Sequence, residues 1–236
     1  MSTKWTELLE AHADSEQFQL DAQKVVLERY QRPVYRYLLG ALRSPESADE
    51  AFQEFALNFL QGAFRHADQK RGRFRDYLKT SLMHLVSGYR KKMQSRNLSL
   101  GEEVPEPAIA VEQDCVAEQE FKMSWRQELL DRTWSALADV ERQTGQPFYA
   151  VLRFRTENPG LPSKPMAEEL TTKLNPNAPF TDTGIRKTLQ RAREWFADLL
   201  LDEVAHSMAN PARQQLEEEL IELGLLEYCR EALQRR

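Results

Sequence analysis

Basic and aromatic side chains alternate between residues 73 and 92 in a pattern typical of single-stranded nucleic-acid binding. Cations pair with phosphates, and unstacked bases stack on aromatic rings. The candidate cations are Arg73, Arg75, Lys79, Arg90, Lys91 and Lys92, and the preceding stretch adds Arg65, Lys70 and Arg71. The candidate rings, Phe74 and Tyr77, also fit the apolar stripe of a helix, so packing in a core is an open alternative for both. The cations of residues 90–92 could equally complement a helix dipole.

A second group of polar side chains follows a predicted helix-turn-helix. Residues 163–174 are expected to form a short helix, residues 175–180 a polar turn, and residues 182–206 a long helix that Thr181 or Thr183 caps. With Ile185 facing inward, the opposite face carries Arg186, Lys187, Gln190 and Arg191. Such a helix can enter the major groove of DNA, although an ordinary solvent-exposed face is the alternative. The turn is longer than the usual three to four residues.

Enzyme chemistry finds little support in this sequence. It contains no glycine-rich phosphate loop, no GxSxG and no HExxH. Glu203 and His206 form one Glu-x-x-His, but a di-iron bundle needs two such motifs and further carboxylates. Cys115 lies in an acidic segment, which disfavours the thiolate, and Cys229 is far away in sequence. We therefore expect no catalytic residue, no metal site and no cofactor.

The composition of the 236 residues predicts an all-α protein. Hydrophobic residues make up 41% and charged residues 29%, as in globular proteins, and runs of Val, Ile and Thr are few. No apolar run reaches the roughly 18 residues that a membrane span needs, and no secretory signal is visible. Two widely separated cysteines suit a reducing compartment. We expect a cytoplasmic protein that does not bind membranes.

The net charge of −5 conceals two opposite segments. Residues 62–96 hold ten basic and two acidic side chains, whereas residues 97–120 hold seven acidic and no basic ones. The acidic segment also contains Gly101, Pro105 and Pro107, which predicts a flexible, self-repelling linker. The expected organisation is a first domain over 1–96, an acidic linker over 97–120, a helix-turn-helix domain over 121–206 and a helical C-terminal extension over 207–236.

Helical periodicity predicts the elements of the first domain as a three-to-four-helix bundle. One stripe runs through residues 22–42, where Pro33 could kink or divide the helix. Ser44 and Pro45 then have the types expected of an N-cap and first turn. The helix that follows buries an apolar face, which includes Leu60. Its opposite face carries Asp49, Glu50, Gln53 and Glu54.

The order of several motifs resembles that of extracytoplasmic-function sigma factors of bacterial RNA polymerase. The first domain is similar to their core-binding and promoter-melting domain through YQRPVYRYLL at 30–39, ADEAFQEF at 48–55, GRFRDYL at 72–78 and residues 85–96. The second is similar to their helix-turn-helix domain through YAVLRFR at 149–155, MAEEL at 166–170 and TDTGIRKTLQRAR at 181–193. The resemblance covers residues 22–206, which is about three quarters of the chain.

The resemblance implies a function and a role for each candidate residue. The chain would be a non-enzymatic sigma factor that binds core RNA polymerase, through the β′ clamp helices and the β flap, and recognises promoter DNA. An anti-sigma factor is a frequent further partner in this family, and the free protein is expected to be a monomer. The residues of the polymerase contact would be Asp49, Glu50, Gln53 and Glu54. Those of the melted −10 element would be Arg73, Phe74, Arg75, Tyr77, Lys79, His84, Tyr89, Arg90, Lys91 and Lys92. Those of the −35 element would be Thr181, Thr183, Arg186, Lys187, Gln190 and Arg191.

Some positions depart from the family pattern. His84 stands where Asn is frequent, Gly88 where Asp is frequent and Thr188 where Arg is common. The alternative function is a dimeric helix-turn-helix regulator that uses its first domain for dimerisation, and a third is a decoy that binds polymerase without initiating transcription. The extension over 207–236 could cap the second domain or bind a partner. The acidic linker is expected to oppose DNA binding by the free protein.

Overall fold

The computed structural model describes residues 16–61, 73–100, 107–174, 178–208 and 211–236, and these residues are all helical or connecting segments. The all-α prediction is confirmed over this part of the chain. The structure divides into two compact units. Unit 1 contains the residues up to Glu128 together with Ala205–Ala212, and unit 2 contains Leu129–Val204 together with Arg213–Arg236. The basic residues Arg65, Lys70 and Arg71 lie outside the described residues.

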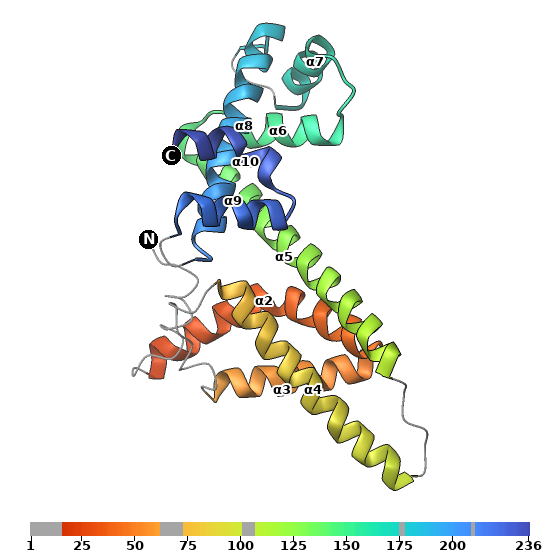
Figure 1. The fold of residues 1–236 in the computed structure, drawn as a ribbon. Helices are drawn as coiled ribbons and strands as arrows, with labels where there is room; N and C mark the ends of the chain where they lie inside the picture. Colours follow the sequence, from red (N-terminus) through yellow and green to blue (C-terminus); the bar gives the residue numbers. More distant parts are fainter. Residues whose placement is uncertain (1–15, 62–72, 101–106, 175–177, 209–210) are drawn as a thin grey trace. The chain divides into compact units, whose positions relative to one another are not determined.

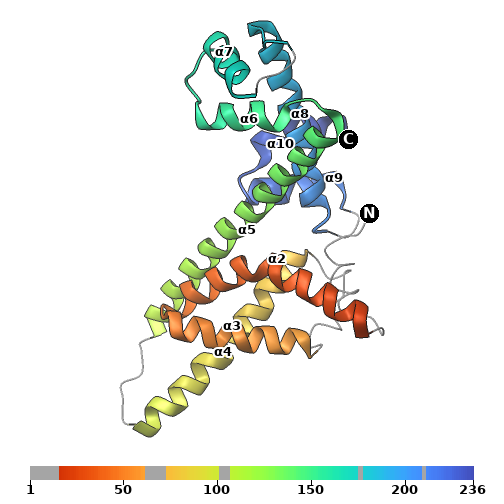
Figure 2. The same ribbon diagram turned by 180° about the vertical axis from the view of Figure 1, so that it is seen from behind.

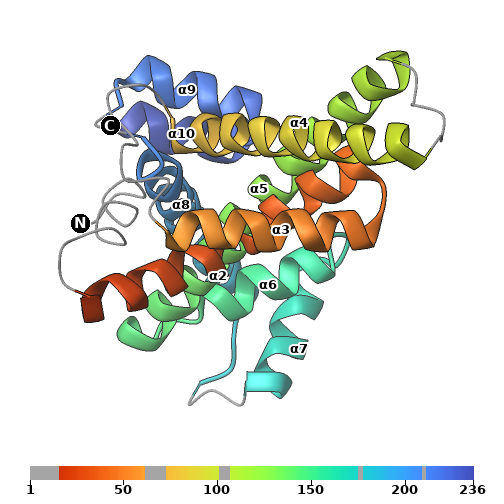
Figure 3. The ribbon, with the colours of Figure 1, turned by 90° about the horizontal axis from the view of Figure 1, so that it is seen from below.

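Unit 1 is built from α2 (Glu16–Leu42), α3 (Pro45–Leu60), α4 (Phe74–Leu100) and the first part of α5 (Pro107–Thr144). Figure 1 shows α3 crossing beneath α2, and Figure 2 shows the same pair from behind. Helix α4 crosses α3 at an angle in Figure 1, and Figure 3 shows the two helices from below. Helix α2 continues through Pro33 without division. The N-cap prediction at Ser44 is confirmed, because its hydroxyl oxygen accepts a 3.2 Å hydrogen bond from the backbone N–H of Ser47.

Aromatic rings form the centre of unit 1. The ring of Tyr30 lies 5.0 Å from that of Phe74 and stacks 5.3 Å from that of Trp125. Phe121 meets Tyr37 edge to face at 5.9 Å. Aromatic pairs at these separations add to the burial of large apolar surfaces. Trp125 and Phe121, which the sequence placed at the start of the second domain, therefore belong to the core of the first unit.

The structure differs from the flexible linker that was expected over residues 97–120, of which residues 101–106 lie outside the described part of the chain. Residues 107–120 form the first turns of α5, which continues as one helix of 38 residues. Ala117 is fully buried, and Gly40 of α2 lies so close that a Cβ built there would be 2.9 Å from the Cα of Ala117. Three of its acidic side chains pair with basic side chains of α2 and α4: Glu120 lies 4.0 Å from Arg36, and Asp114 and Glu118 pair with Arg90 and Lys79. These distant partners relieve the self-repulsion on which the linker prediction depended.

Unit 2 is built from the second part of α5, with α6 (Phe148–Glu157), α7 (Ser163–Leu174), α8 (Asp182–Ala205), α9 (Arg213–Glu222) and α10 (Leu226–Arg235). The buried face of α8 carries Ile185, Leu189, Ala192, Phe196 and Leu200. The ring of Trp134 on α5 lies 4.8 Å from that of Phe196 and edge to face with Tyr149 at 5.8 Å. These contacts give α8 a fixed place against α5 and α6.

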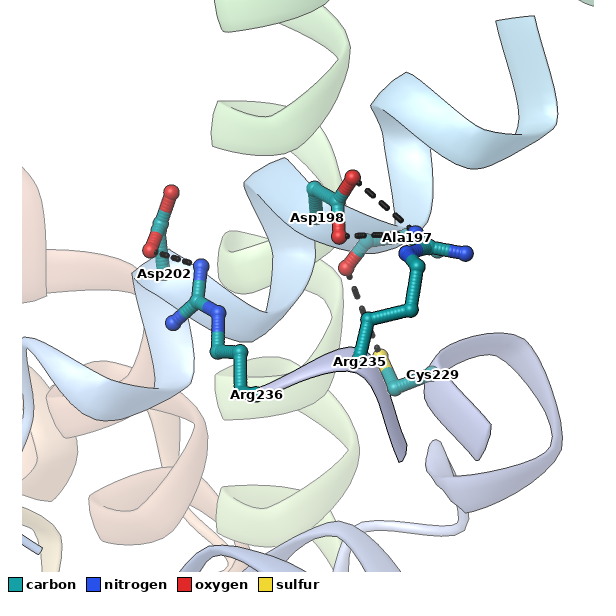
Figure 4. A network of polar contacts seen from close by, with 6 residues as sticks. All are labelled: Ala197, Asp198, Asp202, Cys229, Arg235 and Arg236. Carbon is teal, nitrogen blue, oxygen red and sulfur yellow. Dashed lines mark hydrogen bonds and ion pairs between the residues drawn. The ribbon is translucent and has the colours of Figure 1, made fainter. Parts of the chain in front are cut away.

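The C-terminal extension packs on α8 (Figure 4). Arg235 binds both carboxylate oxygens of Asp198 at 2.9 and 3.0 Å, and Arg236 pairs with Asp202 one turn further along α8. Cys229 is fully buried, with its sulfur 3.9 Å from the carbonyl oxygen of Ala197. Of the two interpretations left open by the sequence, this arrangement corresponds to the cap.

Candidate functional site

The N-terminal half of α8 presents the predicted −35 residues on one exposed face. Thr183, Arg186, Lys187, Gln190 and Arg191 are exposed, or nearly so, while Ile185 and Leu189 point into unit 2. Arg186 pairs with Asp182 on the same helix, and the side-chain amide of Gln190 donates a 3.1 Å hydrogen bond to Glu194. Lys187 and Arg191 make no ion pair or hydrogen bond with the described residues.

Thr181 begins α8 as its N-cap. Its hydroxyl oxygen accepts a 3.0 Å hydrogen bond from the backbone N–H of Gly184. A Cβ at position 184 would lie 2.9 Å from that oxygen, so glycine allows the cap to close. Of the two capping candidates, Thr181 is therefore the cap. One lone pair of this oxygen is thus used within the chain, which leaves its second lone pair and the hydroxyl proton for DNA.

Helix α7 and the turn hold α8 in place. Met166, Ala167 and Leu170 bury one face of α7. Beyond the turn, the backbone N–H of Phe180 donates a 2.8 Å hydrogen bond to the hydroxyl oxygen of Thr171. This bond ties the start of α8 to the end of α7, so the described ends of the long turn are fastened despite its length.

The predicted polymerase residues lie on the outer side of α3. Asp49, Glu50 and Gln53 are exposed, and Glu54 is partly exposed. Two exposed leucines that the sequence did not predict for this surface lie on the same side: Leu57 is 57% exposed and Leu60 is 43% exposed. Leu60 was expected to face the core. A spacing of three to four residues joins these side chains into one exposed acidic-leucine stripe, defined as Asp49, Glu50, Gln53, Leu57 and Leu60.

Two of the predicted −10 residues are buried. Phe74 is 2% exposed and packs against Tyr30 and Trp125, and Arg75 is 3% exposed. In the described conformation, therefore, Phe74 and Arg75 are not accessible to the melted DNA that they were predicted to meet. Phe74 instead takes the alternative place in the core, where Tyr30 of α2 and Trp125 of α5 cover its ring. Tyr77 is partly buried, and this burial raises its pKa.

The cations of α4 are largely paired within unit 1. On one side, Lys79 lies 2.6 Å from Glu118 and Arg90 lies 2.9 Å from Asp114, both on α5. On the other side, Tyr89 and Lys92 bind Glu50 and Glu54 of α3 at 2.8 and 3.0 Å.

Three further residues of the predicted −10 set lie at the start and on the outer face of α4. Arg73, just before the helix, contacts Asp76 at 3.3 Å. His84 and Lys91 are exposed, and the structure gives them no polar partner among the described residues. The strongly basic helix expected from the sequence is thus mostly neutralised by α3 and α5.

The described residues contain no arrangement that suggests catalysis. Within them, no three His, Cys, Asp or Glu side chains are grouped to hold a metal ion. Glu203 lies 2.8 Å from Arg132 of α5, in a pair whose side chains are both less than 20% exposed. Pairing with arginine accounts for Glu203 without any metal. None of the described helices is long and apolar enough to cross a membrane.

Comparison with known proteins yields no match: no family model, no characterised protein and no solved structure is similar to this chain at a significant level. Its function is therefore inferred from the residues and their geometry.

Proposed function

We propose that this protein is a sigma-type transcription initiation factor, which binds core RNA polymerase through unit 1 and promoter DNA through unit 2. The observation that carries the proposal is the exposed face of α8 at its N-terminal half, with two unpaired cations, Lys187 and Arg191. Side chains at the start of a recognition helix reach base edges, and the cations reach phosphates.

The acidic-leucine stripe of α3 supports the polymerase half of the proposal. Exposed leucines beside acidic side chains on one helix face suit a protein partner that is itself basic and apolar. DNA would be repelled by the same acids. Each unit therefore offers a surface for a different partner, which is the requirement for a factor that brings a protein machine to a DNA sequence.

A purified bacterial core RNA polymerase tests this function directly. Run-off transcription on a genomic-fragment library is measured with and without the protein, and polymerase binding is measured by co-elution. The wild type is expected to bind and to create new start sites. The D49K/E50K variant is expected to lose polymerase binding by at least about tenfold, because it reverses charges in the stripe.

The matched control is E217K/E218K on α9, which makes the same charge change at exposed positions outside the stripe. It should bind polymerase like the wild type. Wild-type protein that neither binds polymerase nor starts transcripts, but forms a stable dimer on palindromic duplex DNA, would replace this function by that of a dimeric regulator.

A further inference from the structure

We propose that Asp114 and Glu118 of α5 occupy the places of two backbone phosphates on α4, so that single-stranded nucleic acid binds this face by displacing the two carboxylates. The inference rests on the nucleic-acid role proposed for the chain and concerns how that role is restrained. It assigns a phosphate-binding site to Lys79, Arg90 and Lys91.

The guanidinium of Arg90 is bound by two oxygen acceptors. One terminal nitrogen of its guanidinium donates a 2.9 Å hydrogen bond to the carbonyl oxygen of Ala41, and the other binds Asp114 at 2.9 Å. The carbonyl therefore orients the guanidinium, while Asp114 takes the part that faces outward. Arginine binds carboxylate and phosphate oxygens with the same geometry, so a phosphate can replace this carboxylate without moving the arginine.

Arg90 also borders an open space between side chains. A hollow of about 280 Å³ lies beside it, lined on α4 by Ser87, Arg90, Lys91 and Gln94 and on α5 by Asp114. Lys91 lines the hollow and has no polar partner among the described residues. A phosphate that displaced Asp114 would thus meet these two cations, beside the neutral side chains of the lining, which also include Tyr37, Met83 and Val86.

The ion pairs of Asp114 with Arg90 and of Glu118 with Lys79 are weak. The side chains of Asp114 and Glu118 are 53% and 61% exposed, so water and salt screen their attraction to Arg90 and Lys79. Helix α5 itself is held by the buried Ala117, Phe121 and Trp125. The carboxylates can therefore swing away while the helix stays in place, and their removal exposes cations without unfolding unit 1.

The test measures binding of a fluorescent 15-nucleotide oligo(dT) to the full chain by anisotropy at several salt concentrations. The D114N/E118Q variant keeps the size of both side chains and removes their charge. It is expected to bind about tenfold more tightly than the wild type. The wild type must break two ion pairs that salt weakens, whereas the variant need not, so log K of the variant should fall more steeply with log salt.

Two further variants separate a specific site from a general charge effect. E217Q/E218Q on α9 removes the same charge elsewhere and should change the affinity by less than about twofold, because salt screens distant charges. Adding K79Q to D114N/E118Q should remove the part of the gain that comes from the pair of Lys79 with Glu118. The inference is overturned if D114N/E118Q binds no more tightly than the wild type, if the α9 control gains equally, or if K79Q leaves the gain intact.

The polymerase measurement keeps this inference distinct from the proposed function. A gain in D114N/E118Q without any binding of core polymerase would overturn the sigma role and uphold the phosphate site. Polymerase-dependent transcription by the wild type, without tighter oligo(dT) binding by D114N/E118Q, would uphold the sigma role and overturn the phosphate site.

Discussion

The hydroxyl of Tyr89 on α4 donates a 2.8 Å hydrogen bond to the carboxylate of Glu50 on α3. Lys92 and Glu54 repeat this arrangement one turn further along. The residues that the sequence assigned to DNA and those that it assigned to polymerase are therefore bonded to each other. A partner that takes Glu50 and Glu54 would break these contacts, so binding at one proposed surface of unit 1 makes side chains of the other available to its own partner.

A double-mutant cycle on this pair should give a small but measurable coupling. Tyr89→Phe and Glu50→Ala are each expected to change the free energy of unfolding by less than about 1 kcal/mol, because both sites are largely in contact with water. The coupling energy should be about 0.5 kcal/mol, from urea denaturation of the two single variants and the double variant. Strict additivity would show that the hydrogen bond contributes nothing in solution.

Gly40→Ala should destabilise the protein, whereas Gly88→Ala should not. Both glycines are helical, and alanine is the better helix former by about 1 kcal/mol. At position 40, however, the new Cβ would lie 2.9 Å from the backbone of α5, while at position 88 nothing lies within 4 Å. We expect Gly40→Ala to lower the melting temperature, with a net cost of about 1–3 kcal/mol. Equal effects of the two substitutions would contradict the close contact of α2 with α5.

The two cysteines should differ in reactivity. Cys115 is exposed and Cys229 is buried. In native protein, a thiol reagent such as DTNB should modify one thiol rapidly, and the second should react only after denaturation. The control is Cys115→Ser, which should remove the rapid phase. Rapid reaction of both thiols in the native state would contradict the packing of α10 on α8.

Alkaline pH should weaken the fold through Cys229. Burial, with a smaller contribution from Asp198, raises the pKa of its thiol from the usual 9.0 to about 12. Between these values the unfolded chain loses the proton and the folded chain keeps it, so the free energy of unfolding falls as pH rises from about 9 to 12. Urea denaturation at about pH 8 and pH 10 measures the decline. The Cys229→Ala variant should show a shallower decline, and an unchanged slope would exclude this thiol as its source.

The C-terminal extension should depend more on its apolar contacts than on its ion pairs for stability. Arg235→Ala and Arg236→Ala should together cost about 1 kcal/mol or less, and the loss should shrink in high salt, because both pairs lie at the surface. Leu233 is 4% exposed, and Leu233→Ala should cost about 2–5 kcal/mol at any salt concentration. Thermal melts at low and high salt compare the variants. A larger loss from the arginines would mean that charge, not burial, holds the cap.

The helices outside the acidic segment were largely predictable. The apolar stripes around Ile185 and in residues 163–174 have a clear helical period, and the observed α7 has the bounds expected for it. The exposed face of α8 follows from the same period. Local sequence suffices for such elements because each helix presents one apolar and one polar face.

The acidic segment could not be predicted from its own composition. The apolar stripe of α5 continues toward its N-terminus through Ala117, Phe121 and Trp125, which recur every four residues. The seven acidic residues of the segment outweigh this pattern in its composition. What stabilises the helix here lies on other helices, namely Lys79, Arg90 and the close approach of Gly40. The helical stripe left core packing open for Phe74, but the rings that cover it, Tyr30 of α2 and Trp125 of α5, lie on other helices.

The division into units has a consequence for how such a protein can be recombined. Unit 1 ends at Glu128 and is completed by Ala205–Ala212, where the carbonyl oxygen of Ser207 accepts a 3.2 Å hydrogen bond from the backbone of Phe74. Neither unit is one uninterrupted stretch of sequence. A genetic crossover that exchanged residues 129–236 as a block would therefore remove part of unit 1. Gene fusions and truncations should take account of the unit boundaries after residues 204 and 212 as well as the one after residue 128.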